Sequence, residues 1–224
     1  GGGDAHAKVA LNYIDEFLNL EGAVPMLEMK MFPNAKEITE SVAMWNVYKR
    51  FLRASCADFD HRDAFVCVGD GASPRTAALF AYLSDKAICY AIDPLMGSTP
   101  GVAMRGGVAE CVDEEGWIHT TWSHPWEEVL RLRVLPLRIE QVKLKARRVV
   151  IILVHCHTSI DTVVSSLECE QIAGLITSPC CQWGPLQARL GGEPPAVCYK
   201  DRSMLSEKND VRVWSADRGA CIKA

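Results

Sequence analysis

The sequence predicts an α/β fold, a doubly wound and mostly parallel sheet that follows an N-terminal helical extension. Two observations support this fold class. From residue 63 onward, short apolar runs that suit buried strands alternate with segments of helical period. Before that point, apolar residues recur every three or four positions, as in amphipathic helices. The chain therefore divides into a helical extension, residues 1–60, and an α/β domain, residues 61–224.

Two long helices are expected in the extension. Residues 5–20 repeat apolar side chains at helical spacing, and residues 36–55 do the same. One face of the second helix would carry Ile38, Val42, Trp45, Tyr48 and Leu52. Asn34 and Thr39 are alternative first residues of this helix, because their side chains can accept a hydrogen bond from a backbone N–H of the first turn.

The α/β domain is expected to contain seven strands. In chain order they cover residues 63–71, 87–94, 132–139, 147–157, 171–181, 195–201 and 210–217. Residues 73–85 and 159–170 are predicted helices. Pro136 restricts the third strand to a sheet edge or to a strand end, because proline has no N–H to donate. The last two strands are close in sequence and should form an antiparallel pair at one edge.

Two further segments have less definite interpretations. Residues 97–128 contain three tryptophans, and a loop of this length inside a compact domain suggests a lid over a ligand site. The basic run at residues 143–148 is interpreted as a solvated loop, with an RNA contact as the alternative. Neither segment defines a site by itself.

Composition and charge argue against several classes of function. The formal net charge is −4, which gives no overall basic field of the kind used to bind nucleic acid. Apolar runs such as residues 149–154 are too short to span a membrane, so no membrane partner is expected. The ten cysteines lack the spacing of a disulfide framework, and several lie within apolar runs. We therefore expect free buried thiols and an intracellular protein, cytoplasmic or nuclear.

A glycine turn between the first strand and its helix is the first candidate site. Gly69 and Gly71 would let the backbone approach a ligand at the carboxyl edge of the sheet, but a tight bend without a ligand explains the same residues. Asp93 ends the next strand about twenty residues later, where a carboxylate can accept hydrogen bonds from ribose hydroxyls. An Asp-Pro turn with Pro94 is the alternative there. Together the two features favour a nucleotide-like ligand.

The chemistry of the turn helps to choose the ligand. The dinucleotide fingerprint requires a third glycine, whereas the turn GDGASP has proline at that place. A ligand without a pyrophosphate therefore suits the turn better, and S-adenosylmethionine is the favoured cofactor. A Rossmann-type oxidoreductase is disfavoured.

The same residues resemble a known family. VCVGDGASP resembles the first cofactor motif of class I, Rossmann-like, S-adenosylmethionine-dependent methyltransferases, and CYAIDP resembles the second. The resemblance covers roughly residues 62–216 and implies a seven-stranded fold and methyl transfer. It departs from the family at Cys67, where an acid is usual. Cofactor contacts are expected from Gly69, Asp70, Gly71, Asp93, Pro94, Glu140 and His155, with residues 138–140 on the adenine side.

Histidines and cysteines follow two later strands. The segments VHCHTSIDT at 154–162 and SPCC at 178–181 should open at the same carboxyl edge, and they resemble a methyltransferase branch with His-x-Cys and Pro-Cys-Cys motifs that includes RNA-modifying enzymes. A zinc site, a nucleophilic cysteine with a histidine base, and simple pocket or core residues are the competing interpretations. No metal is assigned. The catalytic candidates are His155, His157 and Cys180.

The sequence thus predicts an S-adenosylmethionine-dependent methyltransferase without identifying its acceptor, with RNA or protein considered. Residues 155–158, HCHT, stand where many methyltransferases carry a polar tetrapeptide for a target amine, so an adenine or glutamine amine gains no support. The alternative is a catalytically inactive methyltransferase-like scaffold in a ribonucleoprotein or protein complex. Cys67 and the missing tetrapeptide favour this alternative.

Overall fold

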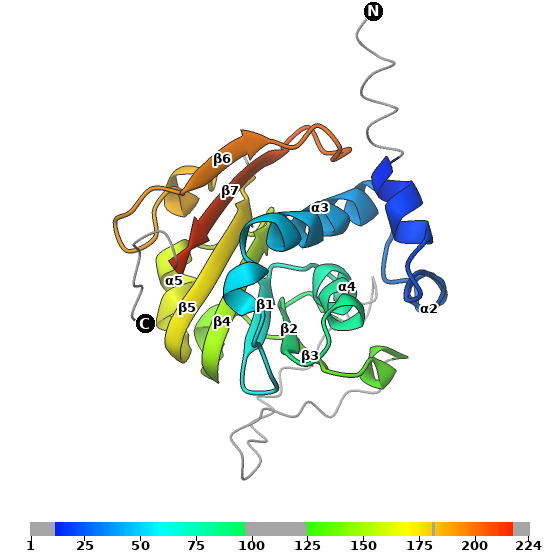
Figure 1. Cartoon of the computed structure of the whole chain (residues 1–224), viewed down its shortest axis with the longest axis horizontal. Coiled ribbons are helices and arrows are strands. Elements are labelled where there is room, and N and C mark those ends of the chain that lie inside the picture. Colours follow the sequence, from blue (N-terminus) through cyan, green and yellow to red (C-terminus); the bar gives the residue numbers. More distant parts are fainter. Residues whose placement is uncertain (1–11, 97–124, 181, 217–224) are drawn as a thin grey trace, which may run out of the picture.

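One seven-stranded sheet organises the protein (Figure 1). The computed structural model describes residues 12–96, 125–180 and 182–216. The strand order is β3-β2-β1-β4-β5-β7-β6. The strands are β1 (Ala64–Val68), β2 (Ile88–Ile92), β3 (Leu132–Leu135), β4 (Leu144–Val154), β5 (Leu167–Ser178), β6 (Val197–Lys200) and β7 (Asp210–Ser215).

The sheet is mostly parallel. Strands β1 to β5 pair in parallel, whereas β7 runs antiparallel to both β5 and β6. The predicted α/β class and the antiparallel pair at one edge are therefore confirmed. The third strand ends at Leu135 and lies at the opposite edge, as Pro136 requires.

Helices cover both faces of this sheet. The helices are residues 12–18, α2 (Ala23–Glu28), α3 (Ala35–Phe51), α4 (Arg75–Leu83) and α5 (Ile160–Ser165). Short 3₁₀ turns are formed by Ala54–Cys56, Pro125–Glu128, Ile139–Gln141 and Pro185–Gln187. In Figure 1, α3 and α4 lie in front of the sheet and α5 lies behind it. Asn34 begins α3, because its side chain accepts a hydrogen bond from Glu37 N–H at 3.1 Å.

Alternate residues of each central strand enter two separate cores. On β1, Phe65 and Cys67 join the core under α3 and α4, while Val66 and Val68 join the core under α5. This alternation follows from the pleat of the strand. Because both faces are covered, the strand reads as a continuous apolar run in the sequence.

The helix α3 belongs to the same core as the sheet. Tyr48 packs edge-on against Phe65 of β1, with ring centroids 5.0 Å apart, and Trp45 packs in the same way against Phe80 of α4, also at 5.0 Å. Aromatic pairs in this geometry contribute beyond their buried area. The helices before residue 60 are therefore packed as one layer of the α/β structure.

Two predictions about secondary structure are wrong. Residues 159–170 were expected to form one helix, but α5 ends at Ser165 and β5 begins at Leu167, because Leu167 pairs with Leu144. The basic run 143–148 was expected to be a loop, but β4 begins at Leu144 and carries it into the sheet. In both cases pairing with the neighbouring strand outweighs the local pattern.

A buried carboxylate holds the amino ends of β1 and β4 together. Asp63 is fully buried and accepts hydrogen bonds from Arg147 and Arg148, with Arg147 Nε at 2.9 Å and Arg148 Nη2 at 3.1 Å. The two arginines thus serve the packing of the strands. Their charges are neutralised by acidic residues of the same protein.

Two expectations from composition can be compared with the structure. The cysteines in the described ranges form no disulfide bond, and four of them, Cys56, Cys67, Cys89 and Cys156, are buried. Within those ranges, no helix is both long and apolar enough to cross a membrane.

Candidate functional site

A cavity of about 380 Å³ opens at the carboxyl edge of the parallel strands. We call it the switch-point cavity, because the strand order reverses between β1 and β4 at this place, where α/β sheets bind ligands. The ends of four strands contribute its walls. They are residues 68–69 at the end of β1, 92–95 at the end of β2, 138–140 after β3 and 155–158 after β4.

Five of the seven predicted cofactor residues line this cavity. They are Gly69, Asp93, Pro94, Glu140 and His155. Asp70 and Gly71 are not among its lining residues. The prediction that separate strand ends meet at one edge therefore describes the geometry well.

The structure itself requires glycine at both Gly69 and Gly71, without any ligand. Gly69 has φ +78°, and a Cβ on it would lie 2.7 Å from Cys156 Sγ, so the loop after β4 passes too close for any side chain. Gly71 has φ +84°, which also favours glycine. Its N–H donates to Asp93 Oδ2 at 2.9 Å. The turn and the acid at the tip of β2 thus hold each other.

Asp93 has hydrogen-bonding capacity left. Besides the bond from Gly71, its Oδ1 accepts from Leu95 N–H at 2.7 Å. An ionised carboxylate offers about four acceptor positions, and the described residues use two of those of Asp93. Asp93 also lines the switch-point cavity, so the acceptor positions that no described residue uses lie at the wall of this cavity.

Asp70 serves the helix α4. Its carboxylate is buried and accepts hydrogen bonds from Thr76 N–H and Ala77 N–H, each at 3.0 Å. Burial raises the pKa of this carboxyl, while Arg75 and the two N–H groups partly oppose the rise. Asp70 therefore satisfies backbone donors of the first turn of α4.

Cys67 lies in the apolar core. Its side chain is buried under α3 and α4 and is not among the residues that line the switch-point cavity. Burial raises the pKa of the thiol well above its usual value. At this position, where the resembling family carries an acid, the side chain contributes packing.

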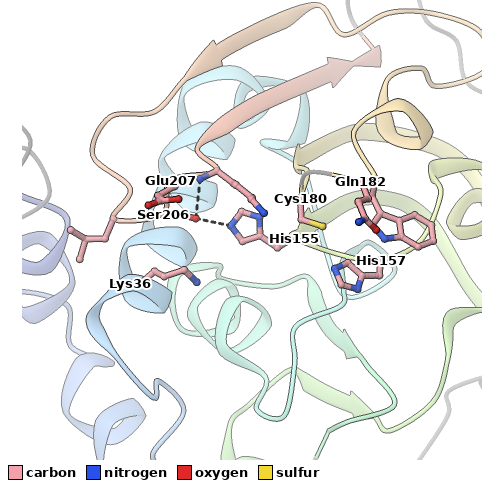
Figure 2. A pocket seen from close by; sticks show the side chains of 10 residues that line it. Lys36, His155, His157, Cys180, Gln182, Ser206 and Glu207 are labelled. Carbon is pink, nitrogen blue, oxygen red and sulfur yellow. Dashed lines mark hydrogen bonds between the residues drawn. The ribbon is translucent and has the colours of Figure 1, made fainter.

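A second cavity, of about 690 Å³, adjoins the first, and we call it the Trp183 cavity. Figure 2 shows its side chains converging from α3, from the loops after β4 and β5, and from the segment before β7. Its lining residues are Lys36, His155, His157, Cys180, Gln182, Trp183, Leu205, Ser206, Glu207 and Lys208. All three catalytic candidates are among them, and His155 and His157 line both cavities.

His155 occupies the boundary between the cavities. It directly follows β4 with φ +50°, an uncommon conformation for a residue with a side chain. Its Nε2 lies 2.9 Å from Glu40 Oε1 of α3 and 3.2 Å from Ser206 Oγ. Its Nδ1 is buried and has no hydrogen-bond partner among the described residues. Strained backbone at such a place is typical of functional sites.

Glu40 is an ionised carboxylate inside the protein. Its side chain is 3% exposed, and Lys36 Nζ lies 3.0 Å away. Burial alone would raise the pKa of Glu40, but hydrogen bonds from His155 and Lys36 and the positive charge of Lys36 oppose burial, and this pKa lies below its usual value. The carboxylate is therefore charged beside His155 at neutral pH.

This arrangement restricts the chemistry of the site. A serine–histidine–acid relay needs the serine and the acid on opposite ring nitrogens, but Ser206 and Glu40 contact the same Nε2. Burial raises the pKa of Cys156 to about 12, so this cysteine is not a thiolate nucleophile at neutral pH. Within the described ranges, no group of three or more histidine, cysteine and acidic side chains could hold a metal ion.

The loops around both cavities are held by buried polar contacts. Gln187 is fully buried and donates to the carbonyl oxygens of Cys156 and Thr158, each at 2.9 Å. Arg212 of β7 donates to the carbonyls of Gly184 and Gln187 at 2.7 and 2.8 Å. These contacts fix the loop that carries Trp183, whose ring stacks on His157 with centroids 5.9 Å apart.

The sequence did not reveal every residue of the site. Glu40 and Lys36 come from α3, and Ser206 comes from the segment before β7. The spacing of Lys36 and Glu40 looks like an exposed helical ion pair, so the sequence carried no signal for a buried acid. Of the earlier expectations, Cys181 and the region 97–124 lie outside the described residues.

Comparisons with known proteins assign no family. No protein-family model matches the chain, and a search of curated proteins gives no match. The functional argument therefore depends on the residues and geometry of this chain.

Proposed function

We propose that the protein is an S-adenosylmethionine-dependent methyltransferase that holds its cofactor in the switch-point cavity. The observation that carries this proposal is the position of that cavity, at the reversal of strand order, with Asp93 at the tip of β2 on its wall. The seven-stranded sheet with an antiparallel edge supports the proposal, because the family resemblance implies such a sheet.

The lining residues suit the parts of this cofactor. Val68, Ile92 and Ile139 give apolar walls for an adenine ring, and Glu140 offers a carboxylate to its amino edge. The acceptor positions of Asp93 that no described residue uses suit the ribose hydroxyls. A volume of about 380 Å³ lies within the range of small-molecule sites. S-adenosylmethionine would supply a methyl group activated by a positively charged sulfur.

The two cavities suggest where the acceptor enters. His155 and His157 line both, so a methyl group held near them would face the Trp183 cavity. Methyl transfer by direct displacement needs mainly proximity and alignment of the two reactants. The rigid loops held by Gln187 and Arg212 support such alignment.

A scaffold without a cofactor is the second candidate function. It is favoured by the structural use of the turn, since Gly69 makes room for Cys156 and Asp93 already binds two backbone N–H groups. Under this alternative the same surface would contact a protein or ribonucleoprotein partner.

Calorimetric titration with S-adenosylmethionine distinguishes the two candidates. We expect saturable binding, weakened at least tenfold in Asp93→Asn, since tenfold corresponds to about 1.4 kcal/mol, the order of a hydrogen bond to a charged group. Glu140→Gln should weaken binding several-fold, and it removes an exposed group with no structural hydrogen bond in the described ranges.

The exposed Glu168 at the opposite end of the sheet provides the matched control. Glu168→Gln should bind the cofactor as the unchanged protein does. If the folded protein shows neither heat of binding nor a higher melting temperature with excess cofactor, the methyltransferase proposal fails and the scaffold is favoured.

A further inference from the structure

We propose that the Trp183 cavity receives a flat acceptor whose nucleophilic oxygen or nitrogen carries a proton, and that His155, positioned by Glu40, accepts this proton. The inference rests on the proposed methyltransferase function, because it names the acceptor class for that reaction. Glu40 acts through His155 and is a positioning residue.

The contacts of His155 assign its two ring nitrogens. Nε2 faces the ionised carboxylate of Glu40 at 2.9 Å, so the N–H belongs on Nε2 and the lone pair on Nδ1. The opposite assignment would put a lone pair against the carboxylate and leave a buried N–H on Nδ1 without an acceptor. A buried donor without a partner is costly. Nδ1 is therefore the basic nitrogen.

The His155–Glu40 pair can accommodate a proton on Nδ1 in addition to the one already on Nε2. When Nδ1 is protonated, the ring becomes a cation whose Nε2–H already donates to Glu40, and such charge-assisted bonds are strong. Lys36 at 3.0 Å keeps Glu40 charged before the proton arrives. The bond from Nε2 to Glu40 therefore fixes the orientation of the ring and leaves Nδ1 as the nitrogen that can receive a proton.

The walls of the Trp183 cavity indicate the shape of the acceptor. Trp183 and His157 both line this cavity, and their rings are stacked with 10° between their planes, so this part of the wall is aromatic. A planar ring can pack on such a wall. Nδ1 is buried in this structure, so an acceptor can reach it only if the atoms that cover it move aside.

In the proposed methyl transfer, every bond that forms is matched by one that breaks, and the proton of the acceptor has a destination. The acceptor oxygen or nitrogen forms a bond to the methyl carbon while the carbon–sulfur bond breaks, and the bonding electron pair stays on sulfur. The proton of the acceptor passes to His155 Nδ1 and is later lost to water. An acceptor without such a proton would gain nothing from this base.

Phenol and its methyl ether anisole test the inference without knowledge of the natural acceptor. Both have one flat ring, but only phenol can donate to Nδ1. Nuclear magnetic resonance of the full chain with ¹⁵N-histidine should show His155 protonated on Nε2, and phenol should shift its Nδ1 resonance saturably. Phenol should bind roughly fivefold more tightly than anisole, the ratio expected for one net hydrogen bond of about 1 kcal/mol.

Two neighbouring acids provide the matched variants. Glu40→Gln removes the charge beside His155, so the phenol-to-anisole ratio should fall toward one. Glu37→Gln removes a carboxylate that pairs with Lys36 and Arg75 and has no contact with His155 among the described residues, so the ratio should persist. If Glu40→Gln does not fold, the inference is still tested in the unchanged protein, because NMR shows which ring nitrogen of His155 carries the proton.

The outcomes separate this inference from the proposed function. His155 protonated on Nδ1, or equal effects of phenol and anisole on it, overturns the inference even if the cofactor binds. Absence of cofactor binding, measured by calorimetry, overturns the methyltransferase proposal whatever phenol does. Preferential phenol binding that depends on Glu40 supports the inference.

Discussion

Gly69 lies where β1 turns beneath the loop that follows β4. Its positive φ and the closeness of Cys156 both exclude a side chain. The residue therefore couples the glycine turn to the histidine segment. The sequence suggested that Gly69 lets a ligand approach the backbone closely. In the structure, the loop after β4 makes this close approach.

At the residue scale, we expect Gly69→Ala to lower the free energy of unfolding by about 2–4 kcal/mol. The left-handed backbone conformation costs an alanine about 1–2 kcal/mol, and overpacking against Cys156 adds a similar amount. Denaturant unfolding measures the loss. Gly191→Ala is the control, because Gly191 has φ +57° but open space around it. Equal losses in the two variants would show that Cys156 does not restrict Gly69.

The contact between His155 and Glu40 shows why the sequence predicted one residue of this pair and missed the other. His155 was a candidate because its segment follows a strong strand, should open at the same sheet edge as Gly69 and Asp93, and could supply a base. Its partner Glu40 lies 115 positions earlier, in a helix that appeared to be outside the α/β domain. No local pattern links the two residues.

At the scale of elements, Asp63 joins β1 to β4. Arg147 and Arg148 donate to its buried carboxylate. Burial alone would raise the pKa of Asp63, but these hydrogen bonds and charges lower it below its usual value. Because the folded-state pKa is lowered, this group stabilises the protein fully above the unfolded-state value of about 4, and the stabilisation is lost as pH falls through the lower folded-state value.

We expect Asp63→Asn to lower the free energy of unfolding at pH 7 by about 2 kcal/mol. This is less than the 3–5 kcal/mol typical of a broken buried pair, because the two arginines are partly exposed. The variant should also lose part of the decline in stability below about pH 4. Thermal unfolding across pH 3–7 measures both effects.

Asp58→Asn is the matched control for this prediction. Asp58 pairs with the same Arg148 but is 74% exposed, so little change is expected. A similar loss of stability in both variants would contradict the assignment of Asp63 as the main link between β1 and β4.

The elements also show where local patterns are insufficient. The amino half of β5 and the basic start of β4 pair with each other, Leu144 with Leu167 and Lys145 with Glu168. Each segment alone resembled a helix or a loop. Each becomes a strand because the other is beside it, and this long-range pairing is absent from any short window of sequence.

At the scale of the whole molecule, the helical layer before residue 60 is part of the sheet's core. Val42, Val47 and Leu52 of this layer pack in the same cluster as Phe65 and Ile176 of the sheet. Without them, the part of this face of the sheet that α4 does not cover would be exposed. Burial of that face contributes a large share of the hydrophobic stabilisation.

We therefore expect residues 61–224 alone not to fold cooperatively. The fragment would expose the apolar face that α3 covers in the full chain. Denaturant unfolding should show no sharp transition, and binding of a hydrophobic dye should exceed that of the full chain. A cooperative transition with the secondary structure of the intact domain would show that the extension is dispensable.

The sequence by itself determined the order of strands and helices along most of the chain. It also placed Gly69, Asp93, Glu140 and His155 at strand ends, because burial, period and turn chemistry are local properties. The parallel arrangement then brought these ends to one edge. Much of the switch-point cavity was therefore foreseeable.

The tertiary structure alone decided what surrounds His155. Glu40 and Ser206 reach it from segments far away in the chain, and Asp70 turned out to serve α4. These contacts depend on how α3 and the segment before β7 pack over the sheet. The physical reason is that an ion pair or hydrogen bond between distant residues is set by the three-dimensional packing of whole elements, which no local periodicity specifies.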